Sequence, residues 1–248
     1  MCLIVFAWRP SHALPLIVAA NRDEFYARPT LPLAQWPETP DVYAGRDLEA
    51  GGTWMGIGAD GRFAALTNIR KPGQPPGRRS RGELVAQFLT NTLSIEDYLS
   101  EVAGRANEYA GFNLLVGDRE SLHFLNATDP QPKRLEAGIY GVSNAGLDTP
   151  WPKLRKARAA LTDHLHDPRP GHLLNLLRDP EAAPVAELPD TGVGLATETL
   201  LSSVFIASPS YGTRASSALI IHADGRRQFI EHSFGPYGGR LGEVELNV

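Results

Sequence analysis

The chain begins with Met1-Cys2-Leu3-Ile4-Val5-Phe6-Ala7-Trp8, and the rest of the fold is organised around this stretch. Its run of apolar residues predicts a strand that is buried on both faces, because a strand with one exposed face alternates apolar and polar positions. The stretch also contains Cys2, the only cysteine of the chain. It does not resemble an export signal, since it lacks a basic n-region, a longer apolar segment and a small-residue cleavage site.

Cys2 has two interpretations. A lone cysteine in a buried strand usually packs as a small apolar side chain. If the initiator Met1 is removed, however, Cys2 becomes the amino terminus, and one residue carries both a thiol and an α-amine. An α-amine with a pKa of about 8 can accept the thiol proton at neutral pH, so the residue would supply a nucleophile and its general base. The position of Cys2 alone favours the role of an apolar packing residue. Other parts of the sequence are needed to choose between this role and that of a nucleophile.

Composition narrows the class of protein. The 248 residues are 42% apolar and 21% charged, which predicts one soluble domain spanning residues 1–248. A net charge of −4 and a pI near 6.0 argue against a nucleic-acid partner. No apolar run approaches the ~18 residues of a membrane span. The single cysteine excludes a disulfide framework and a cysteine-based zinc site, and we expect a cytoplasmic location. The oligomeric state is not determined by the sequence.

The rest of the pattern alternates blocks of strands with pairs of helices. Because the apolar strands are near-continuous, we expect an α+β arrangement of two antiparallel or mixed sheets packed face to face, with helices outside them. The strands are predicted at residues 2–8, 14–20, 51–58, 62–68, 112–117, 121–126, 138–143, 202–207, 216–222 and 228–234. The helices are predicted at residues 82–91, 94–105, 151–165 and 173–177.

Three other segments are predicted to be irregular. Residues 28–40 hold four prolines, residues 71–79 form a basic loop, and residues 180–200 are rich in turn-forming and polar residues. Ser80 and Glu83 complete a capping-box pattern in front of the first helix.

Polar side chains gather where the apolar strands end. A cation such as Arg22 lowers a thiol pKa, and a carboxylate such as Asp23 holds an ammonium group. The side-chain amides of Asn68 and Asn144 can donate to a developing oxyanion. The alternative interpretations are an exposed ion pair of small energetic value and Asx turns. The polar strand ends are Asn21-Arg22-Asp23-Glu24, Asn68, Asn144 and Arg214.

These residues carry a resemblance to the NRDE family, better known as the Transport and Golgi organisation 2 family. The motifs extend over nearly the whole chain in a fixed order. They are Met1-Cys2, Asn21-Arg22-Asp23-Glu24, Ala44-Gly45-Arg46-Asp47, Gly51-Gly52-Thr53-Trp54-Met55-Gly56, Leu66-Thr67-Asn68-Ile69-Arg70, Arg81-Gly82-Glu83-Leu84, Gly111-Phe112-Asn113-Leu114, Gly141-Val142-Ser143-Asn144, Trp151-Pro152-Lys153, Phe205-Ile206 and Tyr211-Gly212-Thr213-Arg214.

The family is similar in turn to the cysteine branch of the N-terminal nucleophile hydrolases. That resemblance implies a four-layer αββα sandwich, with Cys2 as the nucleophile and Arg22 beside its thiol. In that branch the partner aspartate comes three residues after the arginine, whereas Asp23 follows Arg22 directly. Asn68 and Asn144 match the two oxyanion-side asparagines, and Arg214 matches a late arginine. We assign substrate binding to Asn21, Glu24, Arg70 and Arg214.

Three functions are compatible with this reading. The first is hydrolysis of an amide or ester bond in a small or acyl-bearing substrate, through a thioester on Cys2 and without a cofactor or metal. The second is a non-catalytic carrier for haem, lipid or acyl-CoA, in which Arg22, Arg70 and residues 71–79 receive propionates or phosphates. The seven histidines form no haem-binding motif. The third is a structural or interaction protein, which leaves the polar strand ends unexplained.

Overall fold

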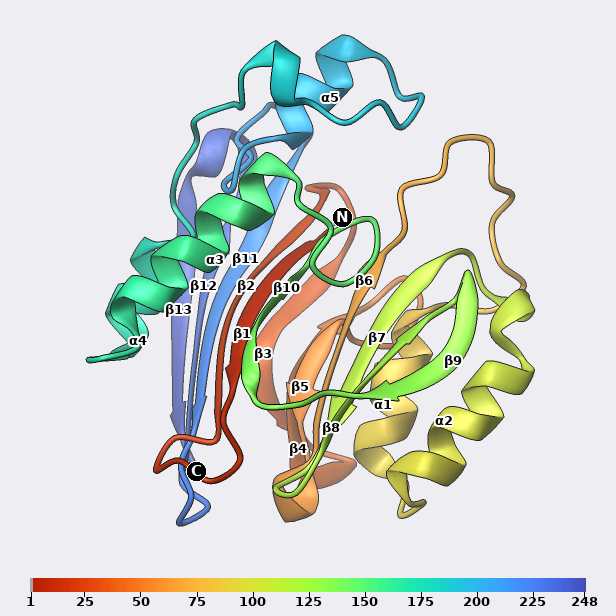
Figure 1. The fold of residues 1–248 in the computed structure, drawn as a ribbon, viewed down its shortest axis with the longest axis vertical. Coiled ribbons are helices and arrows are strands. Elements are labelled where there is room, and N and C mark those ends of the chain that lie inside the picture. Colours follow the sequence, from red (N-terminus) through yellow and green to blue (C-terminus); the bar gives the residue numbers. More distant parts are fainter. Residues whose placement is uncertain (1) are drawn as a thin grey trace.

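The computed structural model describes residues 2–248 and confirms the four-layer αββα sandwich (Figure 1). Both sheets are antiparallel throughout. The first sheet contains, in spatial order, β10 (Gly138–Val142), β1 (Cys2–Trp8), β2 (Leu16–Phe25), β11 (Tyr211–Ile221), β12 (Arg227–Phe234) and β13 (Arg240–Asn247). The second sheet contains β3 (Thr30–Trp36), β4 (Thr39–Asp47), β5 (Met55–Ile57), β6 (Phe63–Asn68), β7 (Phe112–Gly117), β8 (Leu122–Asn126) and β9 (Asp129–Arg134).

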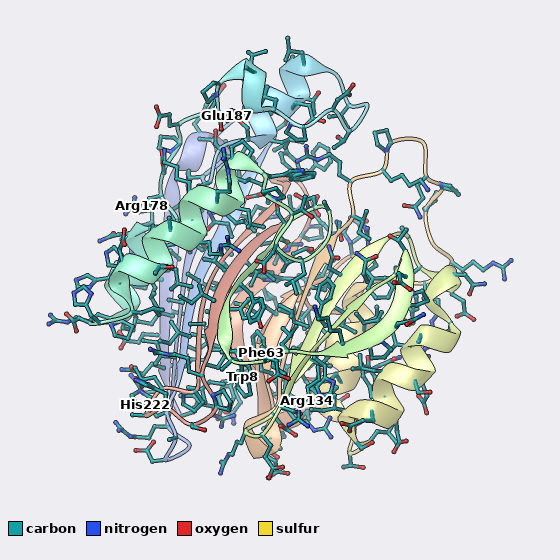
Figure 2. All side chains as sticks on the ribbon, in the orientation of Figure 1. Trp8, Phe63, Arg134, Arg178, Glu187 and His222 are labelled. Carbon is teal, nitrogen blue, oxygen red and sulfur yellow. The ribbon has the colours of Figure 1, made fainter. Side chains whose placement is uncertain are left out.

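Strand β1 is buried along its whole length, as its apolar sequence predicts. Successive side chains of a strand point to opposite faces. Ile4 and Phe6 accordingly belong to the core between the two sheets, whereas Leu3 and Val5 pack beneath the helices. The inter-sheet core also includes Trp8 and Phe63, which lie at the end of the sandwich opposite helix α5 (Leu195–Leu201) (Figure 2).

Each sheet has its own pair of covering helices (Figure 1). Helices α3 (Pro152–His164) and α4 (Pro170–Asn175) bury an apolar stripe against the first sheet. Helices α1 (Gly82–Thr90) and α2 (Ile95–Gly104) do the same against the second sheet. The predicted helices are therefore confirmed, with the last one beginning earlier than expected.

The prediction of an irregular segment at residues 28–40 was wrong, because this segment forms β3 and the start of β4. β3 is an edge strand, where a proline interrupts few ladder hydrogen bonds, so Pro32 is tolerated within it. The rest of β4, an interior strand, was not predicted either. The strands β9 and β13 were also not predicted, and they are edge strands like β3. Edge strands are half exposed and carry the weakest apolar pattern of a sheet.

The C-terminal half departs from the prediction in two places. Residues 202–207 do not form a strand, although all but Ala207 are buried. They follow α5, which lies within the segment predicted to be a loop except for its last residue. Strand β11 begins at Tyr211, five residues before its predicted start. An apolar run therefore indicated burial here without indicating a strand.

Of the two helices that cover the second sheet, only α2 has a side-chain cap among the described residues. Ser94 accepts a hydrogen bond from the backbone N–H of Asp97 at 3.0 Å and caps α2. Helix α1 is instead preceded by Arg81 and has no side-chain cap, so the capping box predicted at Ser80 was wrong. Glu83 accepts hydrogen bonds from Arg79 and Tyr109.

We expect Gly52→Ala to lower the free energy of unfolding by roughly 1–3 kcal/mol, because an added Cβ would meet rigid backbone. It would lie 2.8 Å from the backbone nitrogen of Glu83 and closer still to the Gly82 carbonyl. Urea unfolding followed by tryptophan fluorescence measures the change. Gly104→Ala is the matched control, since nothing lies within 4 Å of its Cβ position. Equal midpoints for the two variants would contradict the close approach of Gly52 to α1.

Candidate active site

A cavity of about 710 Å³ opens at the Cys2 end of β1, between the two sheets. The first sheet contributes residues of β1, β2, β11, β12 and β13 to its wall. The second sheet contributes β3, β4 and the end of β6. Residues 76–82, which lead into α1, also line it, as do Trp54 and a few other loop residues.

The register of the first sheet explains why polar groups meet here. Cys2 is paired with Arg22, Arg22 with Ala215, and Ala215 with Ser233. Residues that are directly opposite in an antiparallel pair point to the same face of the sheet. The four side chains therefore form one transverse row facing the second sheet, and all four line the cavity.

The Cys2 side chain lies in this wall and is only 6% exposed. Burial raises the pKa of its thiol above the ordinary value, and the positive charge of Arg22 opposes that rise. Arg22 is held by the second sheet, since its Nη2 lies 3.5 Å from Asp47 Oδ2 and its Nη1 donates to Thr30 Oγ1 at 3.4 Å. A cation is thus fixed beside the sulfur by residues that the sequence did not single out.

Asp23 points to the opposite face of β2 from Arg22, because adjacent strand residues alternate. Its Oδ1 accepts a hydrogen bond from Thr213 Oγ1 at 2.8 Å, and its Oδ2 lies 3.9 Å from Lys153 Nζ. Asp23 and Lys153 are 1% and 3% exposed. Burial raises the pKa of Asp23, whereas Lys153 acts to lower it. The adjacent residues Arg22 and Asp23 therefore point to opposite faces of β2 and do not pair with each other.

Lys153 is a buried ion-pair partner that we did not predict as a site residue. It is buried on α3, on the helix face that also carries Ala157 and Leu161. A lysine at the apolar spacing of a helix was the available signal, because residues four apart share a helix face. Burial lowers the pKa of Lys153, and the charge of Asp23 opposes this effect.

Asn68 and Asn144 meet, but in different roles. Asn68 lines the cavity at the end of β6. Asn144 is 1% exposed and donates its side-chain Nδ2 to the backbone carbonyl of Asn68 at 2.9 Å. Next to it, Ser143 donates its hydroxyl to the Cys2 carbonyl at 3.0 Å. The segment after β10 thus fixes both β1 and β6 at the site.

The predicted substrate-binding residues divide into two groups. Glu24 and Arg214 line the cavity, whereas Asn21 and Arg70 are absent from its lining among residues 2–248. Asn21 donates to the carbonyls of Leu177 and Val204 and holds the chain together behind β2.

Arg70 forms a buried ion pair with Glu198 of α5 and lies over the Trp151 ring, 4.7 Å from its centroid. Arg214 occupies a β-bulge in β11, since Thr213 pairs with Asp23 and Ala215 with Arg22. A bulge bends the strand and redirects a side chain, and this one places Arg214 in the cavity wall.

Within residues 2–248, no three His, Cys, Asp or Glu side chains form a group that could hold a metal ion. No histidine of this part of the chain lines the cavity. In the same residues, no helix is long and apolar enough to cross a membrane. The predicted removal of Met1 concerns a residue outside the described part of the chain.

Comparison with known proteins identifies relatives over nearly the full length. A family model described as Transport and Golgi organisation 2 matches residues 1–236. The Transport and Golgi organization protein 2 homologs of Bos taurus and Homo sapiens are each 36% identical over 260 residues, covering 94% of this chain and 93% of theirs. The Caenorhabditis elegans ortholog of N-acylethanolamine-hydrolyzing acid amidase has a similar fold, with a TM-score of 0.50 and 11% identity, covering 88% of this chain and 92% of that one.

We expect Arg22→Gln to raise the pKa of Cys2 further, because the charge that favours the thiolate is lost. The rate of alkylation by iodoacetamide, measured against pH, reports this pKa without ambiguity, since Cys2 is the only cysteine. The wild-type profile should lie at higher pH than that of the unfolded protein. Arg169→Gln, at a side chain that is 70% exposed, should leave the profile unchanged. If the pH profile of Arg22→Gln equals that of the wild type, Arg22 does not influence the pKa of the Cys2 thiol.

Proposed function

The chain belongs to the Transport and Golgi organisation 2 family, and we propose that it hydrolyses an amide or ester bond with Cys2 as the nucleophile. The observation that carries this proposal is the position of Cys2, whose thiol lies in the wall of a large cavity beside a fixed cation. A cytoplasmic location is part of the proposal, because a reducing compartment keeps such a thiol free.

The reaction begins with the α-amine of Cys2, which is freed when Met1 is removed. The amine takes the thiol proton, and the sulfur attacks the carbonyl carbon of the substrate. A bond forms between sulfur and carbon while the carbonyl oxygen gains a negative charge. Arg22 favours the thiolate that makes this attack.

The side chain of Asn68 donates to the oxyanion, and Asn144 positions Asn68 through its backbone carbonyl. The tetrahedral intermediate then expels the amine or alcohol, which leaves with the proton held by the α-ammonium group. A thioester on Cys2 remains. Water, deprotonated by the same amine, attacks the thioester, releases the carboxylic acid and restores the thiol.

Asp23 and Lys153 suit the acid–base part of this cycle. Asp23 follows the residue that pairs with Cys2, so it lies at the end of β1 where the freed amine would be. Its carboxylate would stabilise the ammonium form, and the nearby Lys153 cation would oppose it. Together they would keep the pKa of the amine close to neutral, where a general base is most effective.

Support for an acyl substrate comes from the apolar part of the cavity wall. Trp54, Leu66 and Phe234 line it together with the polar row of the first sheet. The Caenorhabditis elegans protein of similar fold is described as hydrolysing N-acylethanolamines, which are amides with an apolar acyl chain. We therefore favour a small amide or ester with an acyl chain as the substrate.

Intact-mass spectrometry tests the first requirement, because the proposed mechanism predicts a protein that has lost Met1. Incubation with a panel of acyl amides and thioesters should add an acyl group to the wild type and none to Cys2→Ala. Asn68→Ala should reduce kcat by about 10²–10³-fold through loss of the oxyanion donor. Asn247→Ala, at the exposed end of β13, is the control and should retain full activity. Retention of Met1 in the active protein would exclude the amine as the base.

A second candidate is a carrier of haem, lipid or acyl-CoA, and one observation favours it. The cavity of about 710 Å³ is lined both by apolar side chains such as Trp54, Leu66 and Phe234 and by arginines, which suits a bulky ligand with acidic groups. The name of the family, which refers to transport, fits this role as well. If haem is the cargo, Cys2 is the residue of the cavity suited to bind its iron, and the arginines of the wall are suited to its propionates.

Titration with haem distinguishes the carrier from the hydrolase. A carrier should give a saturable change in the Soret absorbance, and Cys2→Ala should alter the position of the band because a thiolate ligand is lost. Cys2→Ser provides a control of nearly the same size with a weaker ligand. Absence of saturation in the wild type would contradict haem transport.

A further inference from the structure

The cavity contains more basic than acidic side chains. Seven arginines and five acidic residues line it. Several of these arginines are neutralised by carboxylates at its rim. Arg28 Nε lies 2.7 Å from Asp47 Oδ2, Arg46 pairs with Glu38, and Arg79 pairs with Glu83.

Arg81 and Arg214 differ from these arginines. Among residues 2–248, neither has a carboxylate oxygen within 4.0 Å of its guanidinium nitrogens. Arg81 donates from Nη1 to the carbonyl of Gly111 at 3.2 Å, and Arg214 donates from Nη1 to the carbonyl of Phe25 at 3.3 Å. Backbone carbonyls thus anchor one nitrogen of each group, and other nitrogens remain for a ligand.

The charges around these two arginines are not balanced within the protein. Burial lowers the pKa of both, and for Arg214 the neighbouring cation Arg22 lowers it further. The charge of Glu24 opposes this effect on both, and both side chains line the cavity together with Glu24. Glu24 already accepts a hydrogen bond from the backbone N–H of Phe25 at 2.8 Å. An incoming anion would supply the missing negative charge.

This cavity also includes the reactive sulfur. Arg81 and Cys2 line the same cavity, and the negative charge of a Cys2 thiolate would raise the pKa of Arg81 against the larger effect of its burial. The same cavity wall holds the apolar side chains of Trp54 and Leu66. A ligand with an apolar part and an anionic group matches both kinds of surface.

We propose that Arg81 and Arg214 form an anion-binding subsite beside Cys2, which takes a carboxylate or phosphate group of the ligand. Planar guanidinium groups bind both anions through paired hydrogen bonds. The inference rests on the proposed function in that it describes the ligand of the Cys2 site. It adds that this ligand is an anion, so that a neutral acyl amide is the poorer substrate.

Alkylation of Cys2 tests the subsite without any turnover. Iodoacetate and iodoacetamide each form one S–C bond with the thiolate and release iodide, and they differ by one negative charge. The ratio of their rates on the folded protein, divided by the ratio on the urea-unfolded protein, measures the preference for an anion beside the sulfur. We expect a preference of about tenfold at low ionic strength, decreasing as salt is added.

Substitutions of Arg81 and Arg214 test whether these two residues cause the preference for iodoacetate. Arg81→Gln and Arg214→Gln should each reduce it several-fold, and Arg81→Lys should restore most of it because the charge returns. Arg169→Gln removes an exposed cation far along the chain and should leave the ratio unchanged. Comparison of rate ratios within each variant removes any general effect on thiol exposure.

A folded-protein ratio equal to the unfolded ratio would overturn the subsite, as would a ratio unaffected by Arg81→Gln and Arg214→Gln. Inorganic phosphate and butyrate are added as competitors, to decide whether the subsite prefers a phosphate or a carboxylate. The preferred anion slows the iodoacetate reaction at the lower concentration. Because the assay needs neither Met1 removal nor hydrolysis, its result is independent of the catalytic test. A preference for iodoacetate in a protein that hydrolyses no amide would retain the subsite and reject the hydrolase.

Discussion

The structure depends on the burial of β1 on both of its faces. This strand is covered by the second sheet on one side and by α3 on the other, so its position cannot change without disturbing three layers. Apolar packing extends from Trp8 towards Cys2 and stops where the cavity begins. Beyond that point Arg22, Asp23 and Ser143 replace apolar neighbours, and each is fixed by hydrogen bonds or ion pairs. The strand that is buried on both faces therefore holds the one thiol.

Polar contacts between the two sheets complete the site. Thr67 donates its hydroxyl to the Ser143 carbonyl, and Asn113 donates its side-chain amide to the Ala145 carbonyl at 2.6 Å. These bonds join β6 and β7 of the second sheet to the segment after β10 of the first. The spacing between Asn68 and Cys2 is consequently set by both sheets together, as the proposed role of Asn68 as an oxyanion donor requires.

The sequence was sufficient for the layers and for several polar strand ends that line the cavity, because apolar runs and strand ends are local patterns. It was insufficient for β3, β4, β9 and β13. Of these, β3, β9 and β13 have a proline or polar content that reflects their position at a sheet edge. The opposite directions of Arg22 and Asp23 follow from strand alternation and could have been predicted. The pairing of Arg70 with Glu198 could not, since it joins residues 128 positions apart that no local pattern relates.

The bulge at Arg214 has a consequence for how the chain tolerates changes in length. A strand has a period of two, so one extra residue would reverse the face of every later side chain unless a bulge absorbs it. Arg214 is that extra residue, because Thr213 pairs with Asp23 and Ala215 pairs with the next residue of β2, Arg22. Deleting Arg214 would leave both pairs in register and would remove the side chain that the bulge places in the cavity wall. The extra residue of β11 therefore serves the cavity and is not needed for the pairing of the sheet.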